Sequence, residues 1–181
     1  MAELTEDERH LIAWARGLAT VAKSNAAHNP AAANWRYHSV AELLLDRGRL
    51  FTPQALPANE LGDMGRCYLN ATRYATNHPP VFYTEGLAIH ASCLGISNEH
   101  AWCATGTSAL DPTWPAGQVY LGVPVTGAWL HARQQETRCV SLLWGPPAKT
   151  LLRDGLAEDA LSDAGRPLPD EARLIRPAFT A

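Results

Sequence analysis

Apolar residues recur at helical spacing near the start of the chain. Between residues 6 and 23, leucine, isoleucine, tryptophan and alanine return every three to four positions, which predicts an amphipathic helix. Thr5 stands before this segment and Glu8 follows three residues later, the pattern of a capping box. Ser39 and Glu42 repeat that pattern and predict a second, shorter helix. The N-terminal part of the chain is therefore expected to be helical.

The middle of the chain changes from helical to strand-like patterning. A helix is predicted over residues 67–77, and His78-Pro79-Pro80 ends it. The apolar and β-branched runs that follow are short and are separated by turn residues, as in antiparallel strands. Helices followed by antiparallel strands indicate an α+β fold. Strands are expected at 81–84, with 87–91 as its continuation past Gly86, and at 100–104, 108–114 and 119–125, with a further helix at 127–137.

Proline and glycine mark the segments between and after these elements. Residues 52–65, which include Pro53 and Pro57, are expected to be mostly loop. From Gly145 onward the pattern weakens, and only a weak helix near 151–161 is expected. The chain therefore divides into an N-terminal helix and hinge (1–34), a core (35–144) and a proline-rich C-terminal segment (145–181). That last segment is expected to be either a peripheral tail or an extension docked on the core.

Composition and charge narrow the class of protein. A chain of 181 residues has room for one domain with a core, and its 6 Trp and 5 Tyr supplement a lean aliphatic content. With 15 Lys and Arg against 18 Asp and Glu, no basic face is expected, which argues against nucleic acid as a partner. No apolar run is long enough to cross a membrane. The acidic N-terminus does not resemble a signal peptide, so we expect a cytoplasmic protein.

The 4 cysteines are expected to be reduced thiols, because no export signal accompanies them and no C-x-x-C pair occurs. A zinc site built from His90, Cys93 and Cys103 is conceivable, but the spacing matches no common zinc pattern. Cys93, Cys103 and Cys139 are therefore interpreted as core thiols. No metal or cofactor is expected, and glycine-rich phosphate loops are absent from the sequence.

A predicted hairpin brings a histidine and an aspartate together. If Thr105-Gly106 is a two-residue loop, Ala104 pairs with Thr107, and His100 then faces Asp111 on the same side of the hairpin. A carboxylate beside an imidazole fixes its tautomer and stabilises the protonated ring. The contact depends on the register of the hairpin. His100 and Asp111 are therefore candidate catalytic partners.

Cys67 is the candidate nucleophile. It stands at the start of a predicted helix, where the helix dipole and free N–H groups favour a thiolate, and Arg66 beside it adds positive charge. An imidazolium at His100 would hold that thiolate in an ion pair. The backbone N–H of Cys67 would point toward an oxyanion that forms on an attacked carbonyl. The three residues together predict a Cys-His-Asp triad.

These motifs resemble the transglutaminase-like branch of the papain-like cysteine enzymes, which use a Cys, His, Asp triad in the order found here. The resemblance covers residues 38 to 144 and implies a helix that carries Cys67 packed on a small antiparallel sheet that carries His100 and Asp111. The chain is also similar to a group of short bacterial and phage proteins. The shared segments are Cys67-Tyr68-Leu69-Asn70-Ala71, Tyr83-Thr84-Glu85-Gly86, Glu99-His100-Ala101-Trp102, Asp111-Pro112-Thr113-Trp114 and Tyr120-Leu121-Gly122-Val123-Pro124.

Four further residues are candidates for substrate or oxyanion contacts. Papain-like enzymes place a glutamine upstream of the cysteine, whereas Gln54 is far from Cys67 in sequence; Asn70, one helical turn after the cysteine, is the substitute candidate. Trp102 and Trp114 are expected to be walls of the site or part of the core. Glu85 either lines the cleft or is a solvated strand end.

The predicted function is acyl transfer by a cysteine hydrolase, such as a thiol protease, or by a transferase. Its substrate would be a peptide, a protein side-chain amide, or a small amide or thioester, and water or an amine would resolve the acyl-enzyme. Two alternatives stay open: a catalytically inactive binding module on the same fold, and a redox-sensing thiol protein. The sequence leaves the substrate and the oligomeric state open.

Overall fold

The computed structural model describes residues 3–92, 95–115 and 117–173. Its first element, α1 (Glu6–Ala26), begins with the predicted capping box. The Thr5 side chain accepts the N–H of Glu8 at 3.2 Å, and the Glu8 carboxylate accepts the N–H of Thr5 at 2.9 Å. These bonds satisfy backbone donors that a helix start otherwise leaves unpaired. The capping prediction is confirmed, and the helix continues three residues beyond its predicted end.

The other α-helices also lie near their predicted positions. They are α2 (Val40–Arg47), α3 (Cys67–Asn77), α4 (Gly127–Thr137) and α5 (Ala148–Asp154). Ser39 caps α2 by accepting the N–H of Glu42, while the Glu42 carboxylate turns to the N–H of His38 instead. The bounds of α3 agree with the prediction, because the cis-proline pair Pro79-Pro80 follows its last turn and cannot continue a helix.

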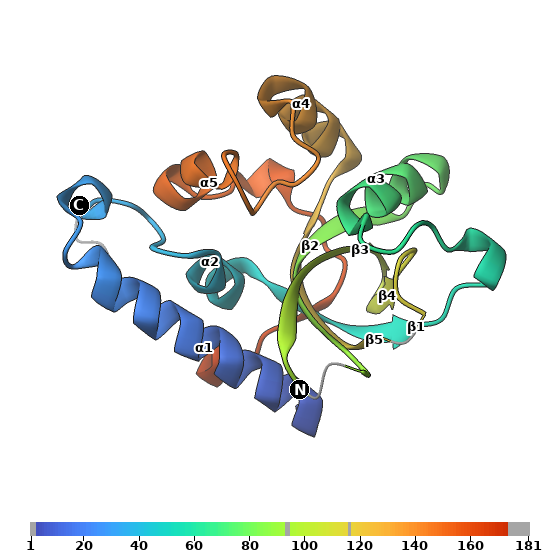
Figure 1. Cartoon of the computed structure of the whole chain (residues 1–181), viewed down its shortest axis with the longest axis horizontal. Helices are drawn as coiled ribbons and strands as arrows, with labels where there is room; N and C mark the ends of the chain where they lie inside the picture. The colour runs from blue at the N-terminus through green and yellow to red at the C-terminus, as the bar shows by residue number, and fades with distance from the viewer. Residues whose placement is uncertain (1–2, 93–94, 116, 174–181) are drawn as a thin grey trace.

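The strands form a sheet that closes on itself (Figure 1). Its order is β4-β3-β2-β5-β1-β6, and β1 also pairs with β4 in parallel, so that β1 to β5 make a barrel. The α+β class is confirmed, but the predicted small antiparallel sheet is corrected to a closed barrel with one parallel pairing. The strands are β1 (Arg49–Gln54), β2 (Phe82–His90), β3 (Ser97–Thr105), β4 (Ser108–Leu110), β5 (Gly117–Val125) and β6 (Arg166–Pro167).

The sequence pattern missed two strands, the short β6 and the longer β1. The pattern predicted loop from residue 52 because proline has no N–H to donate to a sheet. In the structure β1 pairs with β5 only as far as Phe51, and from Thr52 onward it pairs with β4 alone. Pro53 therefore occupies a position with a strand on one side only, where proline is tolerated. This extension past the proline closes the barrel.

Strand β2 runs without interruption through Gly86, so residues 87–90 continue the strand that begins before the glycine, as the sequence pattern suggested. Gly86 pairs with His100 of β3 on one side and with Gly122 of β5 on the other. A Cβ atom at Gly86 would lie 2.0 Å from the carbonyl oxygen of Leu121, so a larger residue would push the strands apart. The glycine is a close-packing position rather than a break.

The barrel wall separates two apolar clusters because side chains alternate across a strand. The inner cluster is small and aromatic, and it includes Phe51, Trp102 and Tyr120. The outer cluster is larger, and α1, α2 and α3 pack on it; Figure 1 shows α1 and α2 to one side of the barrel and α3 against β2 and β3. On β3, the even-numbered side chains of Trp102 and Ala104 therefore lie in the inner cluster, and the odd-numbered side chains of Ala101 and Cys103 lie in the outer cluster.

The segment after Gly145 packs against this core as far as Arg173, which is the last described residue. Leu151, Leu156 and Leu168 are buried in the outer cluster, and β6 pairs with β1. Arg166 also forms an ion pair with Glu8 of α1. Of the two interpretations of this segment, the packing supports the docked extension. Within the described residues no helix combines the length and the apolar character needed to cross a membrane.

Candidate active site

His100 and Asp111 meet, although the predicted hairpin register is wrong. The structure pairs Thr105 with Ser108, so the loop is Gly106-Thr107, one residue later than expected. Gly106 takes the positive φ of 52° that the turn requires. The new register makes His100 and Asp111 diagonal neighbours on one face rather than direct partners. Since β4 ends at Leu110, the chain turns at Asp111, and Oδ2 lies 2.6 Å from His100 Nε2.

Asp111 is held by four hydrogen-bond donors. Its Oδ1 accepts the backbone N–H groups of Thr113 at 2.8 Å and Trp114 at 2.9 Å. Its Oδ2 accepts the hydroxyl of Tyr120 at 2.8 Å as well as the His100 contact. These donors fix the carboxylate in a buried position and replace the water that it loses there. Asp111 therefore orients the imidazole from a rigid support.

Tyr120 is the site residue that sequence reasoning missed. It lies on β5, opposite Ala88 of β2, and both side chains belong to the inner cluster. The alternation of β5 would have placed Tyr120 inside a barrel, but only if closure of the sheet had been predicted. Burial and the nearby Asp111 charge raise the pKa of Tyr120 above its usual value, so its hydroxyl keeps the proton that it donates.

The imidazole of His100 is buried in the barrel, where Trp114 stacks on it and Asp111 and Cys67 change its pKa. The indole of Trp114 stacks on it with ring centroids 3.6 Å apart and an interplanar angle of 11°. Burial by itself disfavours the charged ring, but hydrogen bonds to Asp111 and Cys67, together with their charges, outweigh it and raise the pKa of His100. A raised pKa favours the imidazolium, which is the proton donor that a departing amine needs.

Cys67 is the first residue of α3, and it is one of the groups that act on the imidazole of His100. After burial, which lowers it, and Asp111, which raises it, the interaction with the Cys67 thiol is a further cause that raises the pKa of His100. Because Nε2 is engaged by Asp111, Nδ1 is the nitrogen left to take the proton of Cys67. The thiol is half-buried, and the N–H groups in the first turn of α3 have no partner within the helix. The structure therefore brings the three predicted residues together, with a hydrogen bond between His100 and Asp111 and with Cys67 close enough to influence the pKa of His100.

A short strand explains how a helix on the outside of the barrel reaches a histidine on the inside. Strand β4 pairs with β3 only over Cys103–Thr105, so the part of β3 that carries His100 has no contact with β4. The turn after β4 fills this space, and Asn70 of α3 binds it by donating from Nδ2 to Thr113 Oγ1 at 3.0 Å. The same Nδ2 also donates to the carbonyl of Asp63 at 2.8 Å. Asn70 thus connects α3 to the turn, and its donors are engaged there rather than directed at an oxyanion.

The other predicted wall residues have different environments. Trp102 is fully buried in the inner cluster, whereas Trp114 is half-buried and covers His100. Glu85 is also buried, so it is not a solvated strand end. Its carboxylate accepts the N–H groups of Leu142 and Leu143 at 2.7 and 2.6 Å and the hydroxyl of Tyr83 at 3.0 Å. Burial raises the pKa of Glu85 to about 7, against the lowering effect of these donors.

The remaining thiols differ from Cys67. Cys103 faces α3 on the outer side of β3, where its Sγ contacts the carbonyl of Ala71 at 3.2 Å and burial raises its pKa far above the usual range. Cys139 is half-buried, and Cys93 lies outside the described residues. Over the described parts of the chain, no three histidine, cysteine or acidic side chains gather as a metal site would require.

Comparison with known proteins gave no relatives. No family model, curated protein or solved structure matches the chain. The chemistry of this site therefore has to be inferred from its own residues.

Proposed function

We propose that this protein is a cysteine-dependent acyl-transfer enzyme, with Cys67 as nucleophile, His100 as general base and acid, and Asp111 as the residue that orients His100. The single observation that carries the proposal is the buried imidazole of His100, which is hydrogen-bonded to the carboxylate of Asp111 through Nε2 and whose pKa is also influenced by the Cys67 thiol at a helix start. Nucleophile, base and orienting group within hydrogen-bond reach are the signature of covalent acyl transfer.

The reaction proceeds in two half-reactions. In the first, His100 takes the thiol proton, the sulfur of Cys67 adds to the carbonyl carbon, and the carbon–nitrogen bond of an amide breaks as His100 returns the proton to the leaving amine. A thioester substrate would release a thiol instead. In the second, water or an amine adds to the acyl-enzyme, His100 takes its proton, and Cys67 leaves as the thiol. No cofactor takes part in either step.

The N–H groups at the start of α3 are the proposed oxyanion donors. They lie at the nucleophile itself, and the positive end of the helix dipole adds to their effect. The N–H of Asn70, by contrast, already donates to the carbonyl of Arg66 within the helix at 2.9 Å. The free donors are therefore those of the first helical positions, beginning with Cys67.

The finer proposal concerns the fold family. A helix that begins with the nucleophile and a barrel that carries the histidine and the aspartate, in this chain order, resemble the transglutaminase-like branch of papain-like enzymes. The one parallel pairing, between β1 and β4, and the closure that it produces are features to compare first when a related structure becomes known.

The test is alkylation followed by intact-mass detection. Near neutral pH, iodoacetamide is expected to modify Cys67 much faster than Cys139, a half-buried thiol in the same chain that serves as the control. His100→Ala should slow the labelling of Cys67 and leave that of Cys139 unchanged. Activated esters and amides should then add an acyl mass to the wild type but not to Cys67→Ala.

The outcomes separate the three hypotheses for this site. Equally slow labelling of both thiols, unaffected by His100→Ala, would contradict the enzyme. Fast labelling of Cys67 without any acyl adduct, but with reversible oxidation by peroxide, would favour the redox-sensing protein. Slow labelling of Cys67 in a protein that is still folded would favour the third hypothesis, the catalytically inactive binding module.

A further inference from the structure

The indole of Trp114 covers the imidazole of His100 more closely than two neutral rings prefer. The ring centroids lie 3.6 Å apart, and the ring planes are inclined by 11°. A centroid distance this short leaves little room for an offset, so the rings lie face to face. Neutral aromatic pairs avoid that arrangement because both faces are negative, and they take offset or edge-on positions with centroids about 4.5–7 Å apart. A positively charged imidazolium is instead attracted to the face of an indole.

Two other aromatic side chains lie farther from the same imidazole. The ring centroids of Trp102 and Tyr120 are 6.3 and 6.4 Å from that of His100. The attraction between a cation and an aromatic face extends to about 6 Å from the ring centroid, and it is strongest for tryptophan and where water is excluded. His100 is buried. Of these three aromatic neighbours, Trp114 is therefore the one placed to stabilise a charge on His100.

The turn that carries Trp114 also carries the carboxylate of the site. The backbone N–H of Trp114 donates to Asp111 Oδ1 at 2.9 Å, while Asp111 Oδ2 lies 2.6 Å from His100 Nε2. One turn therefore supplies both the carboxylate at the edge of the imidazole and the indole on its face. Each of these contacts favours the charged ring over the neutral one.

His90, the last residue of β2, contacts the same indole in a different geometry. Its ring centroid lies 5.1 Å from that of Trp114, and the planes are inclined by 74°, the edge-to-face position that neutral rings prefer. The backbone N–H of Ser92 donates to His90 Nδ1 at 3.2 Å. Since a backbone N–H can only donate, this nitrogen carries no proton and the His90 ring is neutral. The two histidines that contact Trp114 therefore differ in geometry as a neutral and a charged ring would.

We propose that Trp114 is a positioning residue of the site, whose indole holds the imidazole of His100 and favours its protonated form, and that His90 keeps the indole in place. The proposal rests on the acyl-transfer function proposed above. A protonated His100 keeps Cys67 as the thiolate and supplies the proton that the leaving group needs. Trp114 acts through His100 and exchanges no proton itself.

A titration of His100 has to take account of the other titratable groups around it. Asp111 follows β4, Cys67 begins α3, Tyr120 lies on β5, and His90 of β2 lies against the same indole. The titration is therefore measured in the Cys67→Ala chain, in which no thiol titrates together with the imidazole. NMR follows the ring signals of His100 against pH, and their loss in His100→Ala assigns them.

Two variants of Trp114, made in that chain, remove the aromatic face or keep part of its effect. Trp114→Leu leaves an apolar cover over His100 without an aromatic face. The midpoint of the His100 titration should move to lower pH by about one pH unit, the change expected when a cation–π contact in a buried site is lost. Trp114→Phe keeps a weaker aromatic face and should move the midpoint less. It also serves as the test if circular dichroism shows that Trp114→Leu does not fold.

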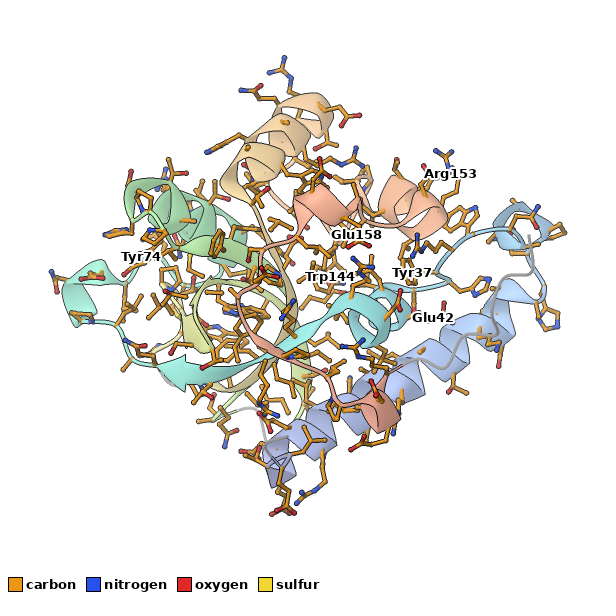
Figure 2. All side chains as sticks on the ribbon, turned by 180° about the vertical axis from the view of Figure 1, so that it is seen from behind. Tyr37, Glu42, Tyr74, Trp144, Arg153 and Glu158 are labelled. Carbon is orange, nitrogen blue, oxygen red and sulfur yellow. The ribbon has the colours of Figure 1, made fainter. Side chains whose placement is uncertain are left out.

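The direction of the change separates this role from simple covering of the ring. Burial lowers the pKa of His100, so a variant that only admits water to the imidazole would move the midpoint to higher pH. An unchanged or higher midpoint in the folded Trp114 variants would overturn the proposal. Trp144→Leu is the control, because Trp144 is also half-buried but packs against the outer cluster; Figure 2 shows it between α2 and the sheet. It should leave the midpoint unchanged.

Two variants that both lack the imidazole of His90 test its part in the proposal. His90→Phe keeps a ring beside the indole, whereas His90→Ala removes it, and neither residue can carry a charge. Any difference between them therefore comes from the ring contact. The midpoint of the His100 titration should be lower in His90→Ala than in His90→Phe. Equal midpoints would overturn the role of His90.

Labelling of Cys67 by iodoacetamide separates this proposal from the proposed function. In the chain that retains Cys67, Trp114→Leu should slow the labelling near neutral pH by up to about tenfold and leave that of Cys139 unchanged. If the triad is wrong but Trp114 acts as proposed, the midpoint of His100 still falls while labelling of Cys67 does not change. If the triad is right but Trp114 has no such role, His100→Ala slows the labelling while Trp114→Leu leaves the midpoint where it was.

Discussion

Two buried carboxylates on opposite faces of one barrel wall differ in what they hold. Asp111 lies with the inner cluster and contacts a side chain that exchanges protons, the imidazole of His100. Glu85 lies on the outer face, and its strongest contacts are with the backbone N–H groups of Leu142 and Leu143, which donate but never titrate. Both carboxylates are nearly inaccessible to water.

The difference distinguishes the proposed active site from a structural site in the same fold. A carboxylate that is satisfied by backbone donors fixes the path of a segment, here the one that leads to Trp144. A carboxylate that also contacts an imidazole changes the proton affinity of that ring and thus its chemistry. Burial and hydrogen-bond count are similar in the two regions, so the identity of the partner decides the role.

Removing the charge of Asp111 should have the largest effect. In Asp111→Asn, the new amide would donate to His100 Nε2 and force the proton onto Nδ1, so the ring could no longer accept the proton of Cys67. We expect acylation of Cys67 to fall about 10³-fold or more, or about 4 kcal/mol in activation free energy. The rate of acyl-adduct formation measures it, and an unchanged rate in a folded variant would mean that Asp111 does not orient His100.

The pH dependence of the free energy of unfolding should reveal the ionisation of Glu85. Its pKa is raised to about 7 from an ordinary 4.5, so the folded protein holds a proton that the unfolded chain releases between these values. The free energy of unfolding should therefore fall as pH rises from about 4.5 to about 7, by about 3 kcal/mol from this group. Urea unfolding at several pH values measures it.

Glu85→Gln is the control for that titration, since an amide is neutral throughout. The fall in this pH window should disappear in the variant, while iodoacetamide labelling of Cys67 stays close to the wild-type rate. The pKa of His100 is raised as well. This residue therefore also lowers the free energy of unfolding as the pH rises above about 6.5 and through the pKa that His100 has in the folded protein. A profile that is identical in wild type and Glu85→Gln would contradict the assignment.

Tyr120→Phe should weaken the support of Asp111 without removing its charge. The change deletes one hydroxyl, whose hydrogen bond to the carboxylate is 2.8 Å long, and keeps the ring that packs on Trp102. A hydrogen bond to a charged group contributes about 1.5–3 kcal/mol, so we expect a loss of about 2 kcal/mol in stability. Thermal unfolding measures it, and a larger drop in acylation than in stability would show that Tyr120 acts through Asp111.

The smallest effect is expected at Ser141, beside Glu85. Its hydroxyl accepts the N–H of Trp144 and donates to the carbonyl of Trp144, both at 3.2 Å, and Ser141 is one of the groups that lower the pKa of Glu85. Since backbone N–H groups continue to hold the carboxylate, Ser141→Ala should cost only about 1 kcal/mol of stability. Chemical denaturation gives the value. A cost as large as that of Tyr120→Phe would mean that side chains, not the backbone, hold the outer region.

Local features of this fold were accessible from the sequence. The capping box of Thr5 and Glu8 and the bounds of α3 depend on neighbouring residues only, and both were predicted correctly. The triad candidates were found because Cys67, His100 and Asp111 fall into recognisable chemical patterns. Their contact survived an incorrect hairpin register because a shift by one residue at the loop left both side chains on the same face.

Features that depend on distant residues were not accessible. Pro53 stands in a strand because β5 has already parted from β1 at that point, which no local pattern indicates. The burial of Glu85 requires the segment after α4, more than fifty residues later, to return over β2. Tyr120 likewise becomes a site residue only through closure of the barrel.

The place of β5 in the sheet has a consequence for synthesis of the chain. A nascent chain that ends at Trp114 already contains every group of the triad, but β5, which lies between β2 and β1, is still missing. Without it the barrel cannot close, and Asp111 lacks the hydroxyl of Tyr120. If Cys67 is the nucleophile proposed above, its thiol is expected to become reactive only after β5 has been synthesised.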